Sequence, residues 1–137
     1  LEQCVLKNKV PFLGICVGMQ LLADESYENG KHKGLGWIGG SIKKLFGSNL
    51  KFPHMGWNNV KIRESFPKMI FSKENKDFYF VHNYYFECLN KKNIIGSTKY
   101  GLNFASIIGK ENIYGVQFHP EKSSVQGLQL IKNFLSI

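Results

Sequence analysis

Cysteine is scarce in this sequence, and the few cysteines fit no disulfide framework. The 137 residues contain three, Cys4, Cys16 and Cys88, and an odd number without framework spacing favours reduced thiols and a cytoplasmic location. The sequence also lacks a signal peptide and any apolar run of 18 residues, which argues against export and membrane association. The four histidines have no metal-ligand spacing with the cysteines, so we expect no metal and no other cofactor.

Arginine is nearly absent, although the net charge is +8. Arg63 is the single arginine, and the lysines are scattered in twos, such as Lys43-Lys44 and Lys91-Lys92, rather than gathered in one stripe. No helix-turn-helix or base-stacking motif accompanies them. We therefore expect no nucleic-acid partner and interpret the lysines as a solvated surface that helps to steer an acidic partner or a phosphorylated substrate.

No internal repeat, linker or low-complexity tract divides the chain. With 43% hydrophobic and 14% aromatic residues it can bury a sizeable core, so we expect one domain over residues 1–137. Short apolar stretches alternate with helical ones, which is typical of an α/β sheet with its site at the carboxyl ends of strands. We expect the end of a helix over 1–9, a helix over 17–25, and strands over 10–15, 57–62, 78–86, 93–99, 103–108 and 113–118, with one more ending near residue 45.

A last helix is predicted to begin after Ser123 or Ser124, either of which can cap it. Its apolar residues recur at helical spacing and fall on one face. They are Val125, Leu128, Ile131 and Leu135.

One cysteine lies between two glycines, in the segment Gly14-Ile15-Cys16-Val17-Gly18. An apolar run precedes it and a helical stretch follows, which is the layout of a nucleophile elbow. We expect glycine at both flanking positions because the turn is too tight for a Cβ atom. A thiol at a helix N-terminus is favoured as the thiolate, so we predict that the pKa of Cys16 is lowered.

A base and a carboxylate follow far downstream, in His119-Pro120-Glu121. Proline enforces extension, so His119 and Glu121 are expected to point the same way, with Glu121 orienting the ring of His119. Each motif also has a structural interpretation: Cys16 as a small buried hydrophobe, His119 as a strand end, and Glu121 as a charge at a helix start. Both motifs in one chain favour a Cys-His-Glu acyl-transfer site.

These residues resemble a known family. The segment Pro11–Gln20 around the cysteine and Gly115–Ser123 around the histidine resemble the class I (triad) glutamine amidotransferases. Within that family, Pro-His-Met-Gly-Trp-Asn over 53–58 and Phe-Val-His-Asn-Tyr-Tyr over 80–85 resemble the branch of glutaminase subunits of imidazole glycerol phosphate synthase. The resemblance covers the chain from about residue 10 to its end.

The resemblance implies a flavodoxin-like α/β fold with the nucleophile elbow, and a role for each matching residue. Cys16 matches the nucleophile, His119 the base, Glu121 its orienting carboxylate, and the N–H of Val17 one oxyanion donor. The family usually has serine where Asn83 stands, which changes a hydroxyl contact into an amide contact. The positions that match the binding site for glutamine are Gln20, Glu28, His82, Asn83 and Tyr84. The positions that face a (β/α)8 cyclase subunit, the partner in a heterodimer, are Pro53, His54, Met55, Gly56, Trp57, Asn58 and Lys122; ordinary core packing is the alternative for Trp57.

The family also carries an N-terminal βα region, whose Pro-Gly-rich turn supplies a second oxyanion N–H. No such turn precedes Cys16 here. We therefore expect that residues 1–137 are the C-terminal part of a longer chain or that the gene product is truncated, and that this polypeptide alone is a poor enzyme.

The implied reaction is hydrolysis of L-glutamine to glutamate and ammonia through a thioester on Cys16, with the ammonia passed to the cyclase for histidine biosynthesis. Three alternatives remain at this point. A paralogue of the same branch supplies ammonia for amidination of a surface-polysaccharide sugar, and nothing in the chain separates it from the first. A Cys-His hydrolase of the peptidase type shares the elbow. A non-catalytic binding module keeps the fold, although the intact triad argues against it.

Overall fold

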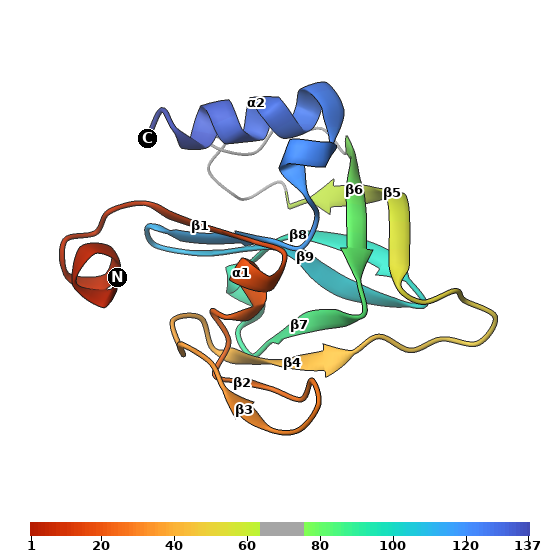
Figure 1. Ribbon diagram of the computed structural model, residues 1–137. Coiled ribbons are helices and arrows are strands. Elements are labelled where there is room, and N and C mark those ends of the chain that lie inside the picture. Colours follow the sequence, from red (N-terminus) through yellow and green to blue (C-terminus); the bar gives the residue numbers. More distant parts are fainter. Residues whose placement is uncertain (64–75) are drawn as a thin grey trace.

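The computed structural model describes residues 1–63 and 76–137, which form one mixed β-sheet with short helices against it (Figure 1). Strands follow one another across the sheet in the order β3-β2-β4-β7-β9-β8-β5-β6, and β10 pairs with both β9 and β1. Among the described strands, the pairings are antiparallel except β1 with β10 and β2 with β4. The strands are β1 (Phe12–Ile15), β2 (Glu25–Ser26), β3 (His32–Lys33), β4 (Gly40–Lys44), β5 (His54–Ile62), β6 (Lys76–His82), β7 (Tyr84–Cys88), β8 (Ile94–Tyr100), β9 (Leu102–Lys110) and β10 (Ile113–Val116).

The core lies on both faces of this sheet, as β9 illustrates. Regular alternation of side chains is interrupted within β9, because its pairing with β8 shifts register between the partners Gly96–Ile107 and Ser97–Ala105. Phe104 and Ile107 of β9 belong to one buried cluster, with Phe80 and Phe118, whereas Ala105 and Ile108 belong to another. The second cluster contains Met19, which anchors the helix that follows Cys16.

Most predicted strands are confirmed, with ends shifted by a few residues. The expected strand over 78–86 is instead two strands, β6 and β7, separated at Asn83. The carbonyl of Asn83 accepts a hydrogen bond from the N–H of Leu45 at 2.8 Å, and the chain passes here from β6, which pairs with β5, to β7, which pairs with β4 and β9. The expected helical end over 1–9 is a single π-helical turn, Gln3–Lys7.

The helix after Cys16, α1 (Val17–Gln20), is much shorter than the predicted range 17–25. In the residues that would continue the helix, the backbone carbonyls bond to another segment of the chain. The carbonyls of Leu21, Leu22 and Ala23 accept hydrogen bonds from the N–H groups of residues 35–38 at 2.9–3.1 Å. Gly34 permits this approach, because a Cβ atom there would lie 2.1 Å from the carbonyl oxygen of Ala23. Tertiary pairing therefore overrides helical propensity.

The last helix, α2 (Ser124–Phe134), packs on a face other than the apolar one. Val125, Leu128 and Leu135 are largely exposed, whereas Gly127 and Leu130 are buried. The helix approaches Pro120 so closely that a Cβ atom on Gly127 would lie 1.9 Å from its carbonyl oxygen. Hydrophobic periodicity cannot reveal a contact that requires the absence of a side chain.

The prediction that a serine side chain caps the last helix is also wrong. Ser123 occupies the N-cap position of α2, but its hydroxyl makes no cap hydrogen bond to the helix. It donates to the carbonyl of His119 at 2.6 Å and accepts from the N–H of Tyr79 at 2.9 Å. The side chain therefore ties the segment before α2 to β6.

The packing of α2 predicts very different losses of stability for two Leu→Ala substitutions. Leu130→Ala should lower the free energy of unfolding by about 2–5 kcal/mol, because it leaves a cavity beneath the helix. Leu128→Ala is the matched control, and its cost should stay within about 0.5 kcal/mol, because the side chain is 61% exposed. Urea unfolding of both variants measures the difference; a larger loss for Leu128→Ala would contradict the assignment of the buried face.

Candidate active site

Cys16 occupies a sharp, strained turn between β1 and α1. Its backbone angles are φ 53° and ψ −108°, a conformation that a residue with a Cβ atom adopts only when its surroundings enforce it. The N–H of Cys16 donates to the carbonyl of Val116 in the neighbouring strand at 2.8 Å, and its carbonyl accepts from Met19 and Gln20. The predicted elbow geometry is confirmed.

The two glycines of the elbow are not equivalent. A Cβ atom on Gly14 would lie 2.5 Å from the carbonyl oxygen of Gly18, so glycine at position 14 lets α1 fold back against β1. A Cβ atom on Gly18 would meet nothing within 4 Å. The expectation that both positions lack space is therefore correct for Gly14 and wrong for Gly18.

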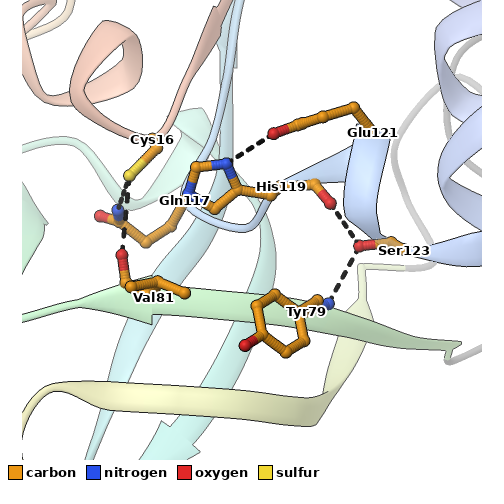
Figure 2. Close-up of polar contacts among 7 residues, drawn as sticks. All are labelled: Cys16, Tyr79, Val81, Gln117, His119, Glu121 and Ser123. Carbon is orange, nitrogen blue, oxygen red and sulfur yellow. Dashed lines mark hydrogen bonds and ion pairs between the residues drawn. The ribbon is translucent and has the colours of Figure 1, made fainter.

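His119 and Glu121 meet in the pairing predicted from the sequence. The ring Nδ1 of His119 lies 2.7 Å from a carboxylate oxygen of Glu121, and the ring lies between Cys16 and Glu121 (Figure 2). Their approach does not come from strand alternation, because Pro120–Lys122 forms a 3₁₀ turn. The N–H of His119 donates to the carbonyl of Tyr79 at 2.9 Å, and its own carbonyl accepts from Ser123. The backbone of His119 is therefore tied to β6 and to Ser123.

The sulfur of Cys16 faces away from His119. Sγ lies 3.8 Å from the carbonyl oxygen of Val81 and 3.8 Å from Nε2 of Gln117 (Figure 2). Within residues 1–63 and 76–137, no hydrogen bond joins Sγ to the ring of His119. The thiol therefore contacts β6 and the segment after β10.

Burial raises the pKa of the Cys16 thiol, with a further contribution from the charge of Glu121, and hydrogen bonds from the N–H of Val17 and from Gln117 lower it less. The predicted lowering is therefore wrong for this arrangement, because a one-turn helix offsets burial only in part. Burial also raises the pKa of Cys88 to about 12. Cys4 is exposed, so thiol reactivity in the absence of substrate does not single out Cys16.

A cavity of about 370 Å³ opens beside the elbow. Three residues assigned to oxyanion or glutamine binding from the sequence, Val17, Gln20 and Glu28, are among its lining residues. The amide nitrogen of Gln20 is already engaged, because it donates to the carbonyl of Tyr84 and to Oε1 of Gln117, both at 3.1 Å. Charged side chains of both signs, Glu25 and Lys33, also line the cavity.

His82, Asn83 and Tyr84 lie outside that lining. Asn83 is exposed at the bend between β6 and β7, and Tyr84 contributes its carbonyl to Gln20. His82 is buried, and both of its ring nitrogens are engaged: Nδ1 lies 2.7 Å from the carbonyl of Tyr84, and Nε2 lies 2.8 Å from Nδ1 of His54. The structure therefore joins His82 to His54, a residue assigned from the sequence to the partner surface.

The two buried histidines form a directed hydrogen-bond chain. The Tyr84 carbonyl can only accept, so Nδ1 of His82 carries the proton and Nε2 accepts from His54. Nε2 of His54 then accepts from the amide of Asn58 at 3.1 Å. Burial lowers the pKa of each histidine to about 4, and the neighbouring histidine adds to this lowering for His54.

The segment assigned to the partner surface divides between two faces of β5. Met55 and Trp57 are 61% and 53% exposed, whereas His54 is buried. Trp57 contacts Tyr79 edge to face at a centroid distance of 6.1 Å. Pro53, Gly56 and Asn58 are partly buried, and Lys122 is exposed. The exposure of Trp57 excludes ordinary core packing for this side chain.

Sequence reasoning assigned no role to Gln117 and gave Ser123 only a capping one. Gln117 stands two residues before His119, at the end of the strand predicted over 113–118. Alternation along that predicted strand would place both side chains on one face, so this signal could have found Gln117, although the structure ends β10 at Val116 and bends at residues 117 and 118. The structure shows no group of three or more His, Cys, Asp or Glu side chains that could hold a metal among the residues it describes. Within the same residues, neither helix is long and apolar enough to span a membrane.

Known proteins resemble the whole chain. A family model described as glutamine amidotransferase class-I matches residues 1–137. A protein of Leptospira borgpetersenii is 44% identical over 141 residues, which cover 100% of this chain and 69% of the relative. A protein of Rhodospirillum rubrum is 46% identical over 98% of this chain and 64% of its own length. Both are named imidazole glycerol phosphate synthase subunit HisH. The chain thus spans about two thirds of the length of these relatives.

Solved structures support the fold. A glutamine amidotransferase from Thermotoga maritima matches 96% of this chain and 50% of its own, with a TM-score of 0.62 and 21% identity. This likeness confirms the predicted α/β, flavodoxin-like fold.

The histidine pair predicts a loss of stability in mild acid. In the unfolded chain both histidines titrate near pH 6.5, whereas the folded pKa of each is about 4. Between these values the unfolded state binds more protons, so the free energy of unfolding is fully maintained above about pH 6.5 and falls as the pH drops towards 4. The pair should account for a loss of about 3 kcal/mol or more.

Urea unfolding at pH 7 and pH 4.5 measures this effect. The double variant His54→Gln/His82→Gln should lose much less stability between the two pH values than the parent protein does. His32→Gln is the matched control, because His32 is exposed, and its pH dependence should equal that of the parent. An unchanged pH dependence in the double variant would contradict our conclusion that His54 and His82 are buried in the neutral form.

Proposed function

Because the chain belongs to the class I glutamine amidotransferase family, we propose that it hydrolyses L-glutamine to glutamate and ammonia through a γ-glutamyl thioester on Cys16. One observation carries this proposal. The strained elbow at Cys16 and the His119–Glu121 pair lie at the carboxyl ends of two adjacent parallel strands, β1 and β10. Within the proposal, residues 1–137 form one glutamine amidotransferase domain that needs no metal and no cofactor.

The triad supplies the proton transfers that this reaction needs. The side chain of Cys16 turns from Val81 towards His119, which takes the thiol proton as Sγ attacks the γ-amide carbon. The oxyanion that forms is stabilised by the N–H of Val17 at the start of α1. His119 returns the proton to the departing ammonia, and water then cleaves the thioester. Glu121 keeps the proton of the ring on Nδ1 and stabilises the imidazolium.

The cavity beside the elbow suits a free amino acid. Its carboxylates can accept hydrogen bonds from an α-ammonium group, and its lysine can pair with an α-carboxylate. We assign Glu28 to the ammonium group and Gln20 to the wall of the site. Asn83 remains a proposed contact at the exposed bend. His82 and Tyr84 do not line the cavity, so we assign them an indirect role. The carbonyl of Tyr84 accepts hydrogen bonds from His82 and from Gln20, which does line the cavity.

The ammonia acceptor is proposed from the relatives. Proteins 44–46% identical to this chain are named subunits of imidazole glycerol phosphate synthase, so we infer that the chain delivers ammonia to a (β/α)8 synthase subunit in histidine biosynthesis, in the cytoplasm. The exposed side chains of Met55, Trp57 and Lys122 offer a contact surface for that partner. These names favour this acceptor over a polysaccharide sugar, and they favour an amidotransferase over a peptidase or a non-catalytic module.

Ammonia release from L-glutamine tests the reaction, measured with and without the co-expressed synthase subunit. Cys16→Ala and His119→Asn should each lower the rate at least a thousandfold, because the triad acts as a unit. Cys4→Ala is the matched control, since this thiol is exposed and lies in the N-terminal turn Gln3–Lys7, outside the elbow, and it should retain the parent rate. Mass spectrometry should detect a γ-glutamyl adduct on the Cys16 peptide. Ammonia release that survives Cys16→Ala would refute the mechanism.

Trp57→Ala tests the proposed partner surface. We expect weaker binding of the synthase subunit, by tenfold or more, because large aromatic side chains are common interface anchors. The free energy of unfolding of the free subunit should change by less than about 1 kcal/mol, since the indole is half exposed. Calorimetric titration measures the binding and urea unfolding the stability. A variant that loses stability but binds the partner with unchanged affinity would place Trp57 in the fold and not in the interface.

A further inference from the structure

A buried glutamine lies directly against the sulfur of Cys16. The side chain of Gln117 is fully buried, and its Nε2 lies 3.8 Å from Sγ (Figure 2). Its backbone N–H donates to the carbonyl of Ser106 at 2.9 Å, which fixes the residue to the sheet. The amide therefore faces the sulfur from a rigid element.

The direction of this amide follows from one backbone carbonyl. The carbonyl of Tyr84 can only accept a hydrogen bond, so the Gln20 atom 3.1 Å from it is the amide nitrogen. The same nitrogen lies 3.1 Å from the side-chain oxygen of Gln117, which must accept from it. The opposite end of the Gln117 amide, which faces Sγ, is then the nitrogen donor.

We propose that Gln117 is the side-chain hydrogen-bond donor that stabilises the Cys16 thiolate, and that Gln20 is the positioning residue that fixes the direction of its amide. The role in catalysis rests on the proposed function of Cys16, whereas the effect on the thiol does not. Neither role coincides with the contacts to glutamine assigned above.

The amide donor of Gln117 becomes important when the sulfur of Cys16 is ionised. The neutral thiol donates to the carbonyl of Val81, and a thiolate has no proton with which to keep that contact. The groups that then favour the anion are the N–H of Val17, the amide of Gln117 and the charge of Lys122, while burial and the charge of Glu121 oppose it. A donor to a charged group contributes more than one to a neutral group.

The dependence of Cys16 alkylation on pH tests the proposal. The rate of reaction with iodoacetamide is measured on the Cys16 peptide by mass spectrometry, with the Cys4 and Cys88 peptides as internal references. Gln117→Leu should raise the pKa of the Cys16 thiol by about one unit, which slows alkylation about tenfold at neutral pH. Gln117→Glu should raise it further, because a carboxylate replaces the donor. Gln20→Leu should cause a smaller rise, since the amide of Gln117 loses its fixed direction.

Gln126→Leu is the matched control. Its amide donates to the carbonyl of Asp77 at 2.7 Å, and its loss should leave the alkylation profile of Cys16 unchanged. A Gln117→Leu protein that is less stable but keeps the parent pKa of Cys16 would overturn the proposal. If that variant does not fold, as judged by circular dichroism, Gln117→Glu, which keeps the shape of the side chain, decides the matter. Because the alkylation assay contains neither glutamine nor partner, a shifted thiol pKa in a protein that releases no ammonia from glutamine even with the co-expressed synthase subunit would refute the proposed function and keep this inference.

Discussion

The parallel pairing of β1 with β10 is the interaction on which the site depends. It aligns Gly14 with Gly115 and Ile15 with Val116, although these residues are about a hundred positions apart in the chain. Cys16 extends the pairing by its hydrogen bond to Val116, so backbone contacts set its place at the sheet edge. A shift of register by one residue would move Cys16 by about 3.3 Å relative to His119, because this is the rise per residue along a strand.

Small residues make this pairing compatible with a helix on top of it. A Cβ atom on Gly115 would lie 2.8 Å from the side chain of Met19, and one on Gly14 would meet the backbone of Gly18. The two aligned glycines therefore leave the space into which α1 settles. Met19 fills that space and is itself fully buried, so packing offsets the unfavourable backbone conformation of Cys16.

Local signals predicted the elements of this fold better than its contacts. The elbow and the His119–Glu121 pair were predictable because each is encoded within a few residues, and most strands follow from runs of apolar residues. The early end of α1 was not predictable, since residues 35–38 take over its carbonyls. The packed face of α2 was missed because its closest contact is at Gly127, which carries no side chain to signal burial.

Charge state and partners of polar groups were the hardest to predict. The sequence correctly places a helix start beside the Cys16 thiol, but the net direction of its pKa depends on burial, which only the packed structure reveals. His54 and His82 stand 28 positions apart and were assigned to different surfaces, yet they share a hydrogen bond because β5 and β6 pair with these residues opposite each other.

The hydroxyl of Ser123 has a consequence for how this sequence can change over time. One fully buried oxygen both donates to the carbonyl of His119 and accepts from the N–H of Tyr79. Only a hydroxyl offers both functions on a single atom within that reach. Alanine would leave the N–H of Tyr79 without this acceptor and would remove one of the two hydrogen bonds that the carbonyl of His119 accepts, the other coming from the N–H of Lys122. A longer amide would need space that the buried position lacks. Substitution at this position is therefore restricted by the geometry of a single atom, the hydroxyl oxygen.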